Sequence, residues 1–149
     1  MKNVELNYGS KKMNKFIINL LNHTWGLAMT LIGYVVRIIL ACCKIHGKGY
    51  GVARCYVVGK YWGGVSLGTT ILISEYSDEE TIAHEIGHTI QNARWGLLFP
   101  FVIAIPSAIR YHYRNYLYRK GAEPKTEYNA IWFEAQASAL GETFRKNHN

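Results

Sequence analysis

The sequence predicts an α+β domain, because helix-type and strand-type patterns follow one another along a chain of 149 residues. Three observations support this fold class. Residues 77–95 combine a helix start signal with apolar side chains at helical spacing. Residues 47–76 are punctuated by glycine and alternate between apolar and polar side chains, as short strands do. Residues 124–145 are expected to form a last helix that Pro124 opens and that ends in basic residues.

Length and composition limit the organisation of the chain. We expect a basic N-terminal arm, residues 1–15, followed by a single domain, residues 16–149. The net charge of +7 suits nucleic acid or anionic lipid. No nucleic-acid motif accompanies the basic residues, so we expect no nucleic-acid partner. The three cysteines include an adjacent pair, which argues against a disulfide framework and favours a reducing environment with buried thiols.

Two apolar segments, residues 16–43 and 96–109, indicate contact with membrane lipid. Residues 25–43 carry a single charge, Arg37, and are long enough to span a bilayer, where Arg37 could snorkel to the interface. A buried or amphipathic helix is the alternative. Residues 96–109 are short and contain two prolines, which suits a re-entrant or interfacial segment or a core hairpin. We therefore expect a membrane-associated protein, and otherwise a cytoplasmic one.

A β-hairpin is expected just ahead of the helix at residues 77–95. Val52–Val58 and Leu67–Ile73 are the predicted strands, and Gly59–Gly64 is the loop that joins them. The exposed edge of such a hairpin could bind a peptide as an added strand. A hairpin that only covers the helix is the alternative.

The helix at residues 77–95 has recognisable ends and an apolar stripe. Ser77 and Glu80 have capping-box spacing at its start, and Gly96 follows its last turn. At helical periodicity its apolar side chains fall on one side, which predicts that this side packs in a core. The stripe consists of Ile82, Ile86 and Ile90.

The polar side of this helix carries the pattern His-Glu-x-x-His. His84 and His88 are four residues apart, so on a helix they share a face and can offer ring nitrogens to one metal ion. Glu85 is next to them, where a carboxylate can take a proton from a metal-bound water. A solvated helix with two incidental histidines is the alternative.

A catalytic zinc ion normally has three protein ligands, so the sequence must supply one more. Glu134 is the best candidate, because it is alone in the otherwise uncharged stretch 128–141, and burying an unpaired carboxylate is costly. A salt-bridged or surface glutamate is the alternative. Glu127, seven residues earlier, is the second choice of ligand. The other candidates further along the chain are His112, Glu123, Glu142 and His148.

These two motifs resemble the gluzincin arrangement of zinc metallopeptidases, in which a His-Glu-x-x-His helix precedes a helix with Glu-x-x-Ala. Here they are His84-Glu85-Ile86-Gly87-His88 and Glu134-Ala135-Gln136-Ala137. Over about residues 20–145 the chain also resembles small, uncharacterised bacterial membrane-associated metallopeptidase-like proteins. The matching segments are Trp62-Gly63-Gly64, His84 to Gln91, Gly96-Leu97-Leu98 and Pro106-Ser107. The resemblance implies a minimal zincin-like core: a metal helix, a second ligand helix and a β-hairpin.

The resemblance also implies an activity, that of a zinc-dependent peptidase acting on a peptide or protein substrate. His84, His88 and Glu134 would hold Zn²⁺, and Glu85 would act as the general base. Related gluzincins often have Asp where this chain has Ser138, which can bond a ligand histidine but carries no charge. Candidates for stabilising the oxyanion of the transition state are Tyr111, His112, Tyr113 and Tyr128.

Two other functions are compatible with the same residues. One is a catalytically inactive zincin-like protein that binds or regulates a partner at a membrane, a possibility that Ser138 raises. The other is a basic membrane-surface module that holds no metal.

Overall fold

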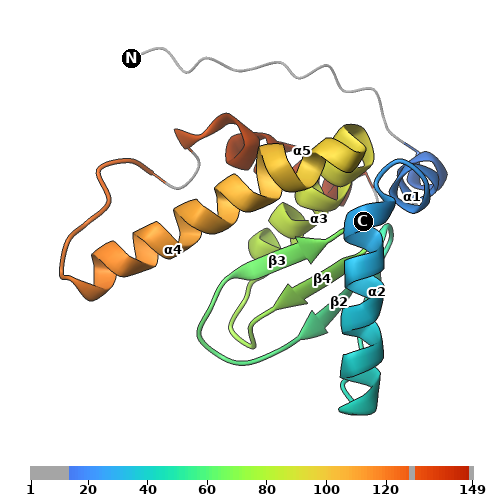
Figure 1. Cartoon of the computed structure of the whole chain (residues 1–149), viewed down its shortest axis with the longest axis horizontal. Coiled ribbons are helices and arrows are strands. Elements are labelled where there is room, and N and C mark those ends of the chain that lie inside the picture. Colours follow the sequence, from blue (N-terminus) through green and yellow to red (C-terminus); the bar gives the residue numbers. More distant parts are fainter. Residues whose placement is uncertain (1–13, 128–129, 148–149) are drawn as a thin grey trace.

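The computed structural model describes residues 14–127 and 130–147, and these residues form the predicted α+β fold. Within them, helices lie on both faces of a four-stranded mixed sheet (Figure 1). Between α3 and α4 the chain makes a 3-10 turn, η1 (Gly96–Leu98), and a π-helical turn, η2 (Pro100–Ala104). The α-helices are α1 (Lys15–His23), α2 (Leu27–Cys42), α3 (Glu79–Trp95), α4 (Ile105–Arg119) and α5 (Trp132–Lys146).

The sheet has the strand order β1-β2-β4-β3. Two antiparallel pairs, β1 with β2 and β3 with β4, are joined by a parallel pairing of β2 with β4. The expected hairpin between residues 52–58 and 67–73 is therefore wrong: these segments are parallel neighbours, and β3 lies outside them at the sheet edge. The strands are β1 (Lys48–Tyr50), β2 (Ala53–Val57), β3 (Gly64–Leu67) and β4 (Thr70–Ile73).

Helix α3 packs on the sheet through the apolar stripe that the sequence predicts. This stripe enters a core cluster with side chains of β2 and β4. In Figure 1, α3 lies behind the sheet and α2 in front of it. The core cluster therefore holds α3 against the sheet, and another side of α3 packs against α5. The clustered residues of these three elements include Ile82, Ile86, Ile90, Cys55, Ile71 and Ile73.

The start of α3 differs by one residue from the prediction. Asp78 is the N-cap, and its carboxylate accepts a hydrogen bond from the Thr81 backbone N–H at 2.8 Å. Ser77 is unavailable for this role because its hydroxyl binds the backbone N–H and the hydroxyl of Ser74. The predicted end is confirmed: Gly96 follows the last turn with φ of 55°, a backbone conformation that favours glycine.

The apolar segment 16–43 forms two helices, with α1 and α2 bent by 88°. Buried polar side chains hold the bend. The Asn92 amide donates to the Asn22 side-chain oxygen at 2.6 Å and to the Gly26 carbonyl at 3.0 Å. Asn22 in turn donates to the carbonyls of Ile18 and Thr89. This network joins the residues at the bend to α3.

Among residues 14–127 and 130–147, no single helix is both long and apolar enough to cross a membrane. The pairs α1–α2 and α3–α4, including the η turns, pass the same test only as bent pairs. Arg37 does not extend away from the fold, as snorkelling would require. Its guanidinium donates to the Thr70 hydroxyl at 2.8 Å and to the Thr69 carbonyl, at the turn between β3 and β4.

Residues 96–109 lead from the end of α3 through η1 and η2 into α4. The chain bends by 117° between the stretch Glu79–Leu98 and the stretch Pro100–Arg119. Phe99 and Ile103 are buried in a second core cluster with Met29 and Phe133. No residue of α4 itself is buried, and the helix projects from the body of the molecule (Figure 1).

The last helix begins at Trp132, so the expected start at Pro124 is wrong. Arg110 and Arg114 of α4 donate hydrogen bonds to the backbone carbonyls of Glu127 and Thr126. These two hydrogen bonds hold the segment before α5 against α4.

Candidate metal centre

The metal-ligand candidates come together because α3 and α5 cross at glycine residues. A Cβ atom added to Gly87 would lie 1.9 Å from the carbonyl oxygen of Ala137. One added to Gly141 would lie 1.7 Å from the carbonyl oxygen of Ala83. The two backbones are therefore in direct contact. This contact carries Glu134 to the histidines of α3.

Three ligand atoms form a compact triangle. His84 Nε2 lies 3.0 Å from Glu134 Oε2 and 3.1 Å from His88 Nε2. His88 Nε2 lies 3.5 Å from the same carboxylate oxygen. Tetrahedral bonds of about 2.0–2.1 Å to zinc would place ligand atoms about 3.3 Å apart. In the part of the chain that the structure describes, His84, His88 and Glu134 are the group that could hold a metal ion, and we call them the metal group.

The electrostatics of the triangle favour a cation. Glu134 is fully buried. Burial acts to raise the pKa of its carboxyl, but the contacts with the rings of His84 and His88 outweigh this and hold the pKa well below its usual range. For His88, burial acts to lower the pKa, and the contact with Glu134 and the charge of Glu85 outweigh it and raise the pKa. Buried carboxylates therefore draw positive charge to the histidines, as a proton or a metal ion.

Gln91 orients His88, a role that the sequence reasoning missed. Its side-chain oxygen accepts a hydrogen bond from His88 Nδ1 at 2.8 Å. The Gln91 amide nitrogen donates to the Phe133 carbonyl at 2.8 Å and to Gln136 at 3.0 Å, which fixes this orientation. With its proton on Nδ1, His88 presents the Nε2 lone pair to a metal. The sequence contains one sign of this role: Gln91 follows His88 by three residues, so on a helix their side chains are neighbours.

Ser138 lies against the other ligand histidine. Its hydroxyl oxygen is 2.9 Å from His84 Nδ1. This is the position at which the gluzincin resemblance leads one to expect Asp. A hydroxyl can accept the Nδ1 proton as a carboxylate would, but it does not add negative charge behind the ring.

Glu85 is buried beneath the edge strand β3. A Cβ atom on Gly64 would lie 2.7 Å from Glu85 Oε1, so glycine in the strand makes room for the carboxylate. Among the described residues, Glu85 Oε2 has no hydrogen-bond partner. Burial raises the pKa of Glu85 and outweighs the opposing charges of His88 and His84. A buried carboxylate with raised proton affinity and an unpartnered oxygen is suited to accepting a proton.

Two cavities meet at Glu85, and both are bounded by Gly64 and by Tyr111 of α4. The polar cavity, of about 410 Å³, lies on the His84 side and is also lined by Thr81, Arg114, Asn115, Tyr118 and Ser138. The apolar cavity, of about 630 Å³, lies on the His88 side and is also lined by Met29, Ile32, Val65, Leu67, Phe99 and Ile105. The lining on the His84 side is therefore the more polar of the two, and we call the two spaces the polar cavity and the apolar cavity.

The oxyanion candidates are placed differently. The Tyr111 hydroxyl accepts a hydrogen bond from the Gly63 backbone N–H at 3.4 Å, beside the junction of the two cavities. His112 lines the apolar cavity. Tyr113 is exposed and lines neither cavity. Tyr128 lies outside the described residues.

The other ligand candidates do not join the metal group. Glu127 lies before α5, not on it, so it does not share a helical face with Glu134. Glu142 pairs with Arg145 and Lys146 on the surface of α5. Glu123 also lies outside the group that could hold a metal. His148 is outside the described residues.

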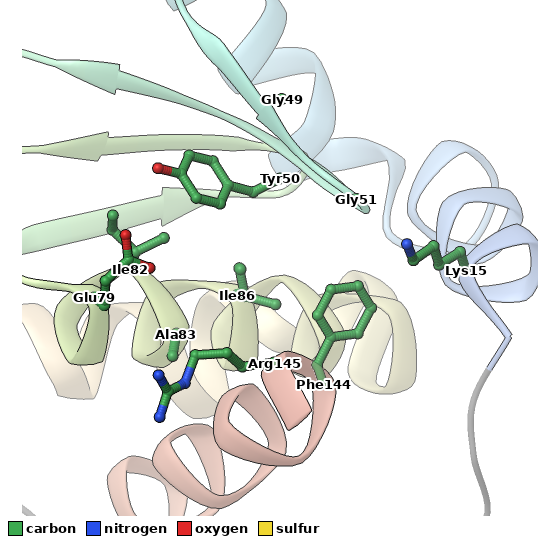
Figure 2. A pocket seen from close by; sticks show the side chains of 10 residues that line it. All are labelled: Lys15, Gly49, Tyr50, Gly51, Glu79, Ile82, Ala83, Ile86, Phe144 and Arg145. Carbon is green, nitrogen blue, oxygen red and sulfur yellow. The ribbon is translucent and has the colours of Figure 1, made fainter. Parts of the chain in front are cut away.

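A further cavity of about 230 Å³ lies apart from the metal group (Figure 2). It is bounded by the turn after β1, the apolar side of α3 and the end of α5, and Lys15 lies over the ring of Phe144 beside it. Neither ligand histidine nor Glu85 lines it.

The chain matches no protein-family model, no curated protein and no solved structure. A function must therefore be inferred from the residues around the metal group.

Proposed function

We propose that the protein is a zinc-dependent metallopeptidase. The observation that carries the proposal is the pairing of two features: a triangle of ligand atoms at the separations of tetrahedral zinc ligands, and the buried Glu85 carboxylate with an unpartnered oxygen beside it. Two imidazoles and one carboxylate are a donor set typical of catalytic zinc, and three protein ligands leave a fourth position open for water.

The residues would divide the work of peptide hydrolysis. His84, His88 and Glu134 hold the metal, which when bound acidifies water and polarises a carbonyl group. Glu85 takes a proton from the attacking water and delivers it to the leaving amine. Tyr111 is our candidate for binding the oxyanion, because its hydroxyl reaches the junction of the two cavities.

The strand β3 suits an extended peptide substrate. It is the last strand of the sheet, so one of its edges has no partner within the sheet. Its residues from Gly64 to Leu67 also line the apolar cavity. A peptide added along this edge would pass Glu85, which lies beneath Gly64.

A second function is favoured by one observation, the contact of Ser138 with His84. A hydroxyl in place of a carboxylate gives the ligand histidine less support, so the scaffold could hold a metal and bind a partner without turnover. This alternative predicts zinc binding without hydrolysis.

The test begins with zinc stoichiometry by elemental analysis of the purified protein. We expect about one zinc per chain in the wild type, and little in His84→Ala or Glu134→Gln. Glu142→Gln is the matched control, because it makes the same change on the exposed side of the same helix. A wild-type protein that holds no zinc even after reconstitution would overturn the proposal.

Hydrolysis of casein or a peptide library then separates the two functions. Glu85→Gln retains the shape of the side chain but loses the base, so we expect it to keep zinc and lose activity. Zinc-loaded wild type without any hydrolysis would favour the binding protein. A fully active Glu85→Gln variant would refute the assigned mechanism.

A further inference from the structure

Acidic residues are absent from two long parts of the sequence. No Asp or Glu occurs between Glu5 and Glu75, or between Glu85 and Glu123, whereas Lys and Arg occur in both. The first part contains α1, α2 and all four strands, and the second contains most of α3, the η turns and α4. The ionic charges on α2 and α4 are therefore all positive.

The same helices expose large apolar side chains. On α2 they recur at helical spacing and form one stripe, made of Leu31, Ile32, Val35, Ile38 and Ile39. On the segment from η1 into α4 a second stripe consists of Leu97, Leu98, Phe101, Ile105 and Ile109. Exposed apolar surface of this extent marks a site of contact with a protein or a membrane.

The two stripes meet at the apolar cavity. Ile32 of α2 is 51% exposed and Ile105 of α4 is 49% exposed, and both line that cavity. Val65 of β3, which also lines the cavity, is 37% exposed. The mouth of the cavity is therefore ringed by apolar side chains that continue outward along both helices.

We propose that the two stripes form a docking surface for an anionic lipid bilayer, with the mouth of the apolar cavity facing the lipid. Charge complementarity favours lipid as the occupant. Lys44 follows α2, and Arg119 and Lys120 end α4, so each apolar stripe leads to cations that can bind anionic headgroups. No carboxylate on these helices opposes that contact. Tyrosines of α4 suit the headgroup region, where a ring is buried while its hydroxyl stays hydrated.

This surface also identifies a class of substrate, an inference that rests on the proposed peptidase function. The apolar cavity opens toward the bilayer, while the polar cavity is lined by Arg114, Asn115 and Tyr118. A polypeptide anchored in the membrane can place its apolar segment in the first cavity and its hydrated segment in the second. The scissile bond would then lie at Glu85, next to the bilayer surface.

Co-sedimentation of the full chain with vesicles tests the docking surface. We expect binding to vesicles of phosphatidylcholine with phosphatidylglycerol to be at least tenfold stronger than binding to phosphatidylcholine alone, and to weaken in high salt. Ile38→Glu and Phe101→Glu alter residues that are 65% and 69% exposed and line neither site cavity, and each is expected to weaken binding about tenfold. Val57→Glu is the matched control on β2, with a side chain 52% exposed.

Several outcomes would overturn the docking surface. The first is a wild type that does not bind anionic vesicles. The second is that Ile38→Glu and Phe101→Glu bind vesicles as strongly as Val57→Glu does. The third is that the wild type forms a dimer in solution and that the same two substitutions dissociate it. His84→Ala separates the proposals, because it is expected to lose zinc and keep vesicle binding. Loss of vesicle binding in a zinc-loaded, active protein would leave the peptidase proposal standing.

The substrate class has a test of its own. A fluorogenic peptide library is tethered to phosphatidylglycerol-containing vesicles through a palmitoyl chain and compared with the same library free in solution. We expect wild type to cleave the tethered peptides at least tenfold faster, and Phe101→Glu to lose this preference while it still cleaves free peptides. Equal rates on tethered and free peptides in wild type would refute the assignment.

Discussion

Adding one methyl group at the crossing of α3 and α5 tests how the metal group is assembled. In Gly87→Ala the new Cβ atom would lie 1.9 Å from the Ala137 carbonyl oxygen, whereas ordinary contacts begin at 3.4 Å. The difference requires the helices to separate by about 1.5 Å at this point. Metal–ligand distances tolerate deviations of about 0.2 Å, so Glu134 would be withdrawn from the histidines.

The expected loss has two measurable parts. Loss of a ligand should weaken zinc binding by more than the roughly 10–100-fold that loss of an outer hydrogen bond costs. The metal-free protein should also be less stable. Alanine is favoured over glycine in a helix by about 1 kcal/mol, but overpacking costs up to about 3 kcal/mol where backbone must move. The net loss of about 2 kcal/mol corresponds to a fall in Tm of about 4–8 °C for a chain of this size.

Zinc affinity is measured by competition with a chelating dye, and stability by thermal unfolding in the presence of a metal chelator. Gly141→Ala should behave in the same way, because its Cβ atom would lie 1.7 Å from the Ala83 carbonyl oxygen. Gly49→Ala is the control, since a Cβ atom there meets nothing within 4 Å. Wild-type zinc affinity together with an unchanged or higher Tm in Gly87→Ala would refute this reasoning.

Single contacts give three further predictions. Gln91→Leu removes the acceptor of the His88 Nδ1 proton and should weaken zinc binding about 10–100-fold in the dye competition; an affinity equal to that of the wild type would contradict the role. The expectation of buried thiols is confirmed for Cys55 and wrong for Cys42 and Cys43, which are exposed. Burial raises the pKa of Cys55 to about 11, so at pH 8 only about one Cys55 thiol in a thousand is ionised. A thiol reagent should therefore label Cys42 and Cys43 at once but Cys55 only on unfolding. Asp78→Ala should cost about 1 kcal/mol at neutral pH by denaturant unfolding, with Asp78→Ser close to wild type. Because hydrogen bonds from Thr81 lower the pKa of folded Asp78 below 3.8, this difference should be present above that pH and vanish as the pH falls through the folded value.

The metal group is the part of the site that sequence reasoning predicts best, and the reason is local geometry. Two residues four apart on a helix must share a face, so the spacing of His84 and His88 is enough to place them together. Glu134 could be added because a lone carboxylate in an uncharged helix needs a buried partner. The structure brings all three together, and their function as metal ligands stays a prediction.

The parts that could not be predicted depend on contacts between distant residues. The bend between α1 and α2 requires Asn22 to meet Asn92, which is 70 residues away in the sequence. The apolar composition of residues 16–43 contains no sign of it. In the same way, the strand patterns of residues 52–58 and 67–73 suit an antiparallel or a parallel pairing. Which pairing forms depends on β3, which lies at the sheet edge over Glu85. The contact between β3 and Glu85 is a tertiary one that the strand patterns do not contain.

Helices α3 and α4, which both line the cavities at Glu85, differ in local stability. The ligand histidines stand on α3, most of whose residues are buried, so its amide protons are expected to exchange with solvent only when the whole domain unfolds. The opposite wall is α4, which buries no residue along its length, and its amide protons should exchange through small local openings. A movement of Tyr111 and its helix can therefore widen the cavities at Glu85 while the distances among His84, His88 and Glu134 stay unchanged.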